Sequence, residues 1–235
     1  DLGTFSRTAV PVPVTASRFE MDARHRAAGG TMGEPVSLTN VEEHTRSVAE
    51  KLEDTLVNGS SVVLGANGLP GYTNFSSREQ LSFSDAAWPS ASVNEAAVTD
   101  VLAMRQALRD DGFTGPYDLY LPANFDGVID EDYKAESDRT LRERLMAIDG
   151  IQNIEILPSL ADSNVLLVQM TRSVVQVPVG QDITTVTWDS HGGLGMHWAI
   201  LAVMSFALKA AYARAPLSSG TLPALTTAAG IAHLS

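Results

Sequence analysis

The feature that most constrains the fold is an amphipathic stretch at residues 40–57. Its apolar positions recur at helical spacing and its other positions are largely charged; the apolar residues are Val41, Val48, Leu52 and Leu56. Thr39, with Glu42 three residues later, predicts the N-terminal cap, and Asn58-Gly59 is typical of a helix end. Because a helix of about 27 Å with one narrow apolar stripe cannot form a core alone, it must lie along a sheet or span a layer.

The next part of the sequence predicts one compact lobe of helices and strands. A second helix is expected from Ser92, with Glu95 at its third position, to Asp111-Gly112. Alternation and helical periodicity then predict a strand, a helix and two strands, at 117–121, 138–148, 154–157 and 165–170. This order indicates one compact α/β lobe, and the fold class expected for the whole chain is α+β.

The last third of the sequence is dominated by period-two alternation. It predicts strands at 175–179, 185–189 and 196–208. The alanine-rich run to Ala213 leaves a helix open as an alternative for the last of these. Gly192-Gly193-Leu194-Gly195 lacks the spacing of a dinucleotide-binding loop, so it predicts a turn between strands.

The N-terminal segment is extended chain rather than helix. Val10, Val12 and Val14 alternate with Pro11 and Pro13, and the prolines leave one edge of a strand unable to donate hydrogen bonds. Farther on, apolar residues alternate with charged ones, and an isolated two-stranded arm is only marginally stable in water. We therefore expect an arm that lies on another structure; a surface hairpin packed on its own domain is the alternative.

The charge balance and the lack of cysteine exclude several classes of function. Lys and Arg number 16 against 28 Asp and Glu, a net charge of −12, which disfavours general attraction to DNA or to an anionic membrane. With no cysteine, the chain has no disulfide, thiol nucleophile or cysteine-ligated zinc. No apolar run reaches the ~18 residues of a membrane span.

The residues that could carry catalysis or bind a metal do not form a convincing site. In Asp189-Ser190-His191 the side chains are adjacent, whereas the groups of a catalytic triad must converge through space. The acidic run around Asp130 lacks the alternating ligands of a calcium loop, and no histidines are paired at helical spacing. We expect no catalytic, cofactor-binding or metal-binding residues; a small α+β hydrolase using His191 or the acidic loop is the enzyme alternative.

Several segments between residues 36 and 190 match one known protein family in their order and approximate spacing. The run from Val36 through the helix to Asn58-Gly59, and then Gly68-Leu69-Pro70-Gly71, resemble that family's long helix and following turn. Asp111-Gly112-Phe113-Thr114-Gly115-Pro116-Tyr117-Asp118-Leu119 is similar to its "DGIEGPYTLVI"-like segment. Leu157-Pro158, the strand at 165–170 and Gly180-Gln181-Asp182-Ile183 follow in the same order. The sequence therefore resembles the encapsulin-type shell proteins, which share the Hong Kong 97-type fold with the major capsid proteins of tailed double-stranded DNA phages.

The resemblance implies a Hong Kong 97-type capsid fold and a role for each part of the chain. It implies an N-terminal arm or extended loop (1–35), a peripheral domain (36–91, with the spine helix at 40–57), an axial domain (92–172), and a return to the peripheral domain with the tail (173–235). The arm would lie across a neighbouring subunit. Its expected inter-subunit contacts are Arg18, Phe19, Met21, Arg24 and Arg26.

Two departures from encapsulins favour a mature phage capsid protein. The sequence starts in the arm, at Asp1 instead of Met, without the N-terminal helix of encapsulins, and the region from Gly192 onward matches poorly. We therefore expect a protein that assembles into pentamers and hexamers of an icosahedral shell around double-stranded DNA, without sequence-specific binding, cofactor or membrane. It would belong to a virion capsid assembled in the host cytoplasm, with other capsid, portal or decoration proteins as possible partners. The alternative is an encapsulin nanocompartment around a cargo enzyme.

Overall fold

The chain forms two compact units, each made of segments distant in sequence. The computed structural model describes residues 10–25, 36–64, 67–76, 78–82, 94–134, 137–162, 164–190, 192, 194–208 and 213–216. One unit, here called the spine unit, comprises Ala9–Leu69 and Val177–Ala207. The other, here called the five-stranded unit, contains Pro70–Gln176 and the chain from Leu208 onward.

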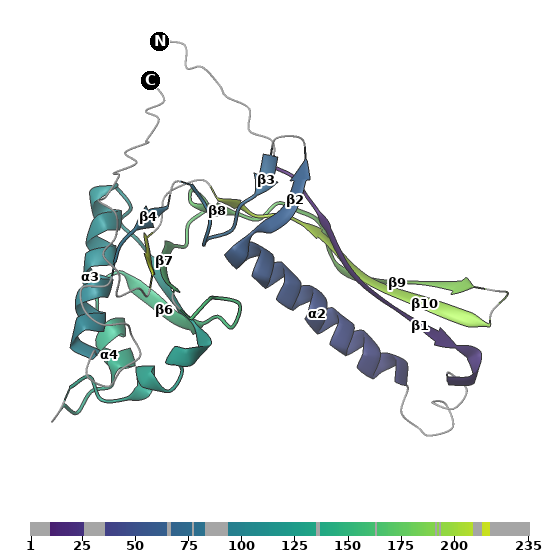
Figure 1. Cartoon of the computed structure of the whole chain (residues 1–235), viewed down its shortest axis with the longest axis horizontal. Helices are drawn as coiled ribbons and strands as arrows, with labels where there is room; N and C mark the ends of the chain where they lie inside the picture. The colour runs from purple at the N-terminus through teal and green to yellow at the C-terminus, as the bar shows by residue number, and fades with distance from the viewer. Residues whose placement is uncertain are drawn as a thin grey trace, which may run out of the picture. The chain divides into compact units, whose positions relative to one another are not determined.

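The spine unit consists of a long helix against one face of a three-stranded sheet (Figure 1). The helix is α2 (Val36–Asn58), and the strands, in the order β1-β10-β9, are β1 (Val14–Asp22), β10 (Gly195–Met204) and β9 (Val179–Ser190). Both pairings are antiparallel, with Phe19 opposite Trp198 and Trp198 opposite Thr187. A short hairpin of β2 (Ser60–Leu64) and β3 (Asn67–Leu69) follows the helix. The strand prediction for 196–208 is confirmed over most of its length.

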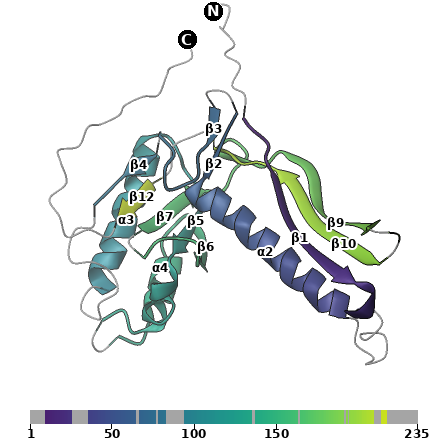
Figure 2. The ribbon, with the colours of Figure 1, turned by 45° about the vertical axis from the view of Figure 1, so that its right-hand side comes forward.

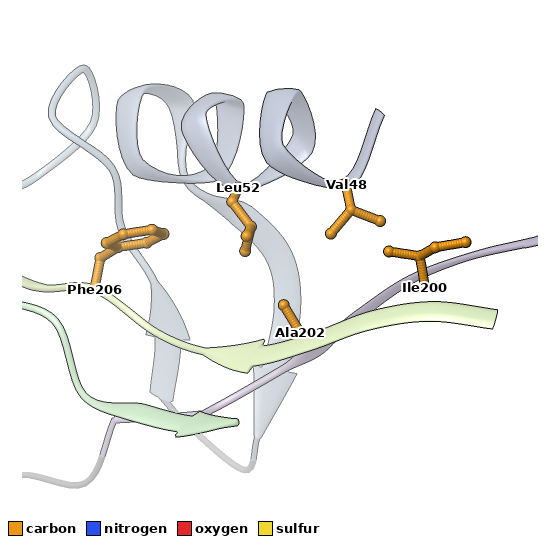
Figure 3. Close-up of a cluster of buried hydrophobic side chains, with 5 residues drawn as sticks. All are labelled: Val48, Leu52, Ile200, Ala202 and Phe206. Carbon is orange, nitrogen blue, oxygen red and sulfur yellow. The ribbon is translucent and has the colours of Figure 1, made fainter. Parts of the chain in front are cut away.

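The core of this unit lies between α2 and β10. Val48 and Leu52 of the helix pack with Ile200, Ala202 and Phe206, and all five are at most 8% exposed (Figure 3). These residues include two members of the apolar stripe that the sequence predicts. The helix therefore buries its narrow stripe on the sheet, and its charged faces remain exposed.

The end of the spine helix is confirmed, whereas its predicted start at residue 40 is wrong. Gly59 adopts φ 78°, and its N–H donates to the carbonyl of Thr55 at 2.9 Å, as expected for a glycine that ends a helix. At the other end, α2 begins at Val36, so Thr39 lies inside the helix instead of capping it. The spacing of Thr39 and Glu42 also fits one exposed helical turn, so this pattern alone did not fix the boundary.

The five-stranded unit contains a mixed sheet with helices packed on it (Figure 2). In the order β4-β12-β7-β5-β6, the strands are β4 (Glu79–Gln80), β12 (Ala213–Pro216), β7 (Asn164–Gln169), β5 (Tyr117–Leu121) and β6 (Ile151–Ile156). The helices are α3 (Asn94–Asp110), α4 (Leu141–Met146), η1 (Ala123–Phe125) and η2 (Val128–Asp130). Every residue of β7 is buried, as befits the middle strand.

The helices and strands of this unit follow the sequence prediction with shifted ends. The strand at 117–121 is confirmed, and the predicted strand at 154–157 starts earlier, at Ile151. The helix predicted at 138–148 is shorter, because the Thr140 side chain accepts a hydrogen bond from the Glu143 N–H and so caps the first turn. Ser92, the expected cap of the second helix, lies outside the described residues.

The division into units differs in position from the domains expected from the sequence. The chain passes from the spine unit to the five-stranded unit at Leu69/Pro70, whereas the expected boundary lay between 91 and 92. The chain returns to the spine unit at Gln176/Val177 and enters the five-stranded unit a second time at Ala207/Leu208. Strand β12, which follows the second entry, belongs to the five-stranded sheet. The short strands β8 (Val175–Gln176) and β11 (Ala207–Leu208) lie at these last two crossings.

We predict that Leu52→Ala lowers the free energy of unfolding of the subunit by about 2–5 kcal/mol, because it removes buried methyl groups from the α2–β10 core. Leu38→Ala in the same helix is the matched control, since Leu38 is 59% exposed and its truncation changes stability by only about 0.5 kcal/mol. Urea unfolding of dissociated subunits, followed by circular dichroism, measures both. Equal losses for the two variants would contradict the assignment of the core.

Candidate inter-subunit surfaces

The arm residues predicted to contact a neighbour lie on both faces of β1. Exposure alternates along this strand, with Phe19 half-buried and Met21 8% exposed on the face toward α2. Arg18 is exposed on the opposite face, and Arg24 is exposed just beyond the strand. Arg26 lies outside the described residues. The predicted alternation of apolar and charged faces is thus present in the part of the arm that the structure describes.

The apolar face of β1 packs on its own chain. The Phe19 ring stacks on His44 of α2, with centroids 4.8 Å apart, and on Trp198 of β10 at 5.7 Å. The hydroxyl of Ser17 lies 2.7 Å from Nδ1 of the same histidine. These contacts anchor β1 within the spine unit, as the surface-hairpin alternative anticipates. Phe19 therefore stabilises the subunit itself.

The opposite face of β1 carries exposed charged side chains. Arg18 and Glu20 are exposed there, and the Glu20 carboxylate is 3.8 Å from His197 Nε2. At the end of the strand, the Asp22 carboxylate accepts a hydrogen bond from the His25 backbone N–H at 2.8 Å, which lowers the pKa of Asp22. These exposed side chains remain available to a neighbouring molecule.

The proline-blocked edge of the arm faces its own chain. The N–H of Ala23 donates to the Leu194 carbonyl at 2.9 Å, in register with the β1–β10 pairs. Because hydrogen-bonding direction alternates along a strand, odd-numbered residues of β1 point their N–H groups at β10 and even-numbered ones point away. Pro11 and Pro13 are on the inward side, where the carbonyl of Pro11 accepts from the Ser205 hydroxyl at 2.7 Å. The prolines thus limit pairing with β10 and leave the outer edge able to donate.

A partly buried polar cluster lies on the five-stranded sheet. Asp118 is 8% exposed and accepts a hydrogen bond from the Asn153 side-chain amide at 3.2 Å. Burial raises the pKa of Asp118 above its ordinary value of 3.8. Burial, with the charge of Asp118 nearby, also raises the pKa of Tyr120 to about 12. Burial, with Tyr120 nearby, raises the pKa of Tyr72. Both tyrosines therefore stay neutral at physiological pH.

The residues considered for catalysis or metal binding are not brought together. Asp189 is exposed at the end of β9, and His191 lies outside the described residues. In the acidic run, the Asp130 carboxylate accepts a hydrogen bond from Arg142 Nε at 2.7 Å, which lowers the pKa of Asp130. Within the described ranges, no three side chains of His, Asp or Glu form a group that could hold a metal ion. None of the described helices has the length and apolar character needed to cross a membrane.

A match to a family model places the chain in a class of shell-forming proteins. A family model described as "Encapsulating protein for peroxidase" (Linocin_M18) matches residues 2–197. The chain belongs to this family. A comparison with curated proteins found no match. The family likeness inferred from the segments between 36 and 190 is therefore confirmed.

Solved structures with the same fold come from shells of several kinds. A virus-like particle from Pyrococcus furiosus matches with a TM-score of 0.65 and 17% identity, over 88% of this chain and 77% of that chain. The capsid of Myoviridae phage XM1 matches with a TM-score of 0.72 and 10% identity, over 88% and 74%. The capsid of an empty GTA particle matches with a TM-score of 0.64 and 12% identity, over 93% and 79%. The predicted Hong Kong 97-type capsid fold is confirmed.

One exposed element was not singled out by the sequence interpretation. Strand β9 is exposed along both faces, including Ile183, Val186 and Trp188. Its sequence carries a signal that could have revealed it, since residues 179–190 contain Val, Ile, Thr and Trp but no Lys, Arg or Pro. A long strand of this composition at a sheet edge is typical of one that pairs with another chain.

We predict that Asp118→Asn stabilises the subunit at neutral pH. Because burial raises the pKa of this carboxyl, the folded state binds its proton more tightly than the unfolded chain does. The ionised carboxylate therefore destabilises the fold above pH 3.8, and the advantage of Asn should shrink as the pH falls toward that value. Thermal unfolding of both proteins between pH 7 and pH ~4 measures this.

Asp130→Asn is the control, because Arg142 lowers the pKa of Asp130. Its carboxylate stabilises the fold when ionised, so this variant should be no more stable than the parent at neutral pH. A stabilisation by Asp130→Asn equal to that by Asp118→Asn would show that the effect is one of net charge and not of burial.

Proposed function

We propose that this chain is the major capsid subunit of an icosahedral shell that encloses double-stranded DNA. The observation that supports it most is the fold shared with the capsid of phage XM1. The family match along residues 2–197 supports a shell of either kind. The shell would be built from pentamers and hexamers, with the five-stranded unit as axial domain and the spine unit as peripheral domain. Its work is done by interfaces, and no catalytic step is assigned to it.

The charge of the chain supports a DNA container. A net charge of −12 gives the wall little attraction for phosphate groups, so a genome can be packed and released without binding tightly. Each subunit would make several modest contacts, and linking them through the shell multiplies their effect. The particle would be a virion capsid assembled in the host cytoplasm, with portal or decoration proteins as possible additions.

An encapsulin nanocompartment is the second candidate, and the family description favours it. That description names a protein that encapsulates a peroxidase, so a shell of this family can hold an enzyme. The same fold and the same self-association serve both functions. The two differ in what the shell contains: nucleic acid in the first and a folded protein cargo in the second.

In either shell, we assign the exposed arm residues to contact with a neighbouring subunit. Arg18 and Arg24 are exposed and make no ion pair that would occupy them within the described residues. Arg26 extends the same basic group in the sequence. The remainder of the chain is strongly acidic, so a neighbouring copy offers this group complementary charge. Phe19 and Met21 would support the contact by holding β1 in place.

We predict that the purified protein forms large uniform shells that protect DNA from nuclease. Negative-stain electron microscopy and a nuclease-protection assay on the same sample test this. Closed shells that contain a protein cargo and no DNA would favour the nanocompartment, once capsids that assembled without packaging are excluded. Particles of one or two subunits under assembly conditions would contradict both shells.

We further predict that Arg24→Glu with Arg26→Glu prevents shell assembly while the subunit stays folded, because the reversed charges repel an acidic neighbour. Sedimentation measures assembly, and circular dichroism measures folding. The matched control is Arg139→Glu with Arg172→Glu, which reverses two exposed charges outside the arm. Normal assembly of the double variant would contradict the assignment of the arm.

A further inference from the structure

Strand β9 is a long edge strand that the described part of this chain leaves uncovered. It has 12 residues, and on its outer side no strand of the described residues pairs with it. All residues from Gly180 to Asp189 are exposed, and β9 runs along the edge of the sheet (Figure 1). Val186 and Trp188, 40% and 43% exposed, lie on the face away from α2. Helix α2 packs mainly against β1 and β10.

The register of the sheet fixes which backbone groups of β9 point outward. The backbone N–H and C=O groups of the even-numbered residues of β10 point at β1, so those of its odd-numbered residues point at β9. Their partners are even-numbered, as in the pair of Trp188 and His197. The N–H and C=O groups of Ile183, Thr185, Thr187 and Asp189 therefore face outward from the sheet.

The N–H group at one of these outward positions is already used in a local hydrogen bond. The N–H of Ile183 donates to the Asp182 carboxylate at 2.8 Å. The Asp182 carbonyl in turn accepts from the Thr184 hydroxyl at 2.9 Å. The open stretch therefore consists of Thr185, Thr187 and Asp189, which are symmetric about Thr187.

The two edges of the sheet differ in how they are protected. The outward positions of β1 include Arg18, Glu20 and Asp22, and charged side chains on an edge oppose pairing with another strand. Residues 179–190 contain no Lys, Arg or Pro, and alternate Thr, Val and Trp in the middle of the strand. The open edge of β9 therefore favours strand addition, and the edge of β1 does not.

We propose that β9 pairs antiparallel with β9 of a second copy of this chain, across a two-fold axis at Thr187. This inference rests on the proposed function, since a shell supplies identical copies as neighbours. In this register Thr185 lies opposite Asp189 of the second copy, and Thr187 lies opposite itself. All three open N–H groups then find carbonyl partners, and the Ile183–Asp182 bond marks where pairing ends.

The side chains also suit this register. On the face away from α2, Val186 lies opposite Trp188 of the second copy, a pair of aromatic and β-branched residues that stabilises a sheet. The symmetry makes this pair occur twice. On the other face, the Thr185 hydroxyl can donate to the carboxylate of Asp189 of the second copy.

The acidic residues do not oppose each other. Outward positions are odd-numbered, so two antiparallel β9 strands pair odd with odd and even with even positions. In the proposed register Asp189 lies opposite Thr185 of the second copy, and Asp182 lies beyond the end of the paired stretch. Their charges leave the pairing free of the like-charge repulsion that acidic edges otherwise create.

Engineered cysteines test the register directly, because the chain has none of its own. Thr187→Cys places two cysteines about 5.5 Å apart between Cα atoms, within the range of a disulfide. Thr185→Cys is the matched control, because it makes the same change on the same face of the strand. In the proposed register the cysteine that this variant places in one copy is displaced by four residues, about 14 Å, from the same cysteine of the other copy, which is too far for a disulfide. Assembled particles of each variant are oxidised and analysed by non-reducing electrophoresis, with electron microscopy of the same sample.

We expect covalent dimers from Thr187→Cys shells and monomers from Thr185→Cys shells. Shells of Thr187→Cys without dimers, or equal cross-linking of both variants, would overturn the strand pairing and leave the shell function intact. If the unaltered chain forms no shells, the proposed function fails, and the pairing fails with it.

A second pair of variants tests the pairing without cysteine chemistry. Thr187→Lys places two ammonium groups opposite each other at the axis and should raise the protein concentration needed for assembly by about tenfold. Thr187→Val keeps a β-branched side chain and should assemble like the parent. An unchanged assembly concentration for Thr187→Lys would overturn the proposal.

Discussion

The packing of one helix stripe on one sheet face is the interaction on which the spine unit depends. Val48 and Leu52 meet Ile200 and Ala202, and this contact holds β10 in place between β1 and β9. Phe19 extends the same core by stacking on His44 and Trp198. Because α2 has a single apolar stripe, it covers a single face of a narrow sheet. The other face and both edges of that sheet receive no layer from the described chain.

This incomplete coverage leaves a surface that assembly can cover. A protein that functions alone covers or charges its open strand edges, and the β1 edge of this sheet follows that rule through Arg18 and Glu20. Strand β9 exposes backbone groups and apolar side chains together. By contrast, the middle strand of the five-stranded sheet, β7, is buried over its whole length. A shell of identical copies is a state in which the open edge of β9 can be covered.

The sequence predicted the type of most elements because their signals are local. Helical spacing from Val41 to Leu56, the stop at Gly59 and the alternation around Phe19 each depend on residues a few positions apart. It misplaced the helix start, because the spacing of Thr39 and Glu42 fits an exposed turn inside a helix as well as an N-terminal cap. It placed the passage between units near 91, although the chain crosses at Leu69. A crossing of this kind depends on which distant strands pair, and no local pattern encodes that.

The same distinction applies to the candidate surface. Local patterns in the sequence show that β1 has a charged face and an apolar face, that two prolines block one edge, and that the chain resembles a shell protein. The pairing of distant strands is what places the blocked edge against β10, packs Phe19 on its own helix and leaves β9 as an unprotected edge. The reason is physical: alternation along a strand fixes which residues share a side, but pairing with a distant strand fixes which side faces outward.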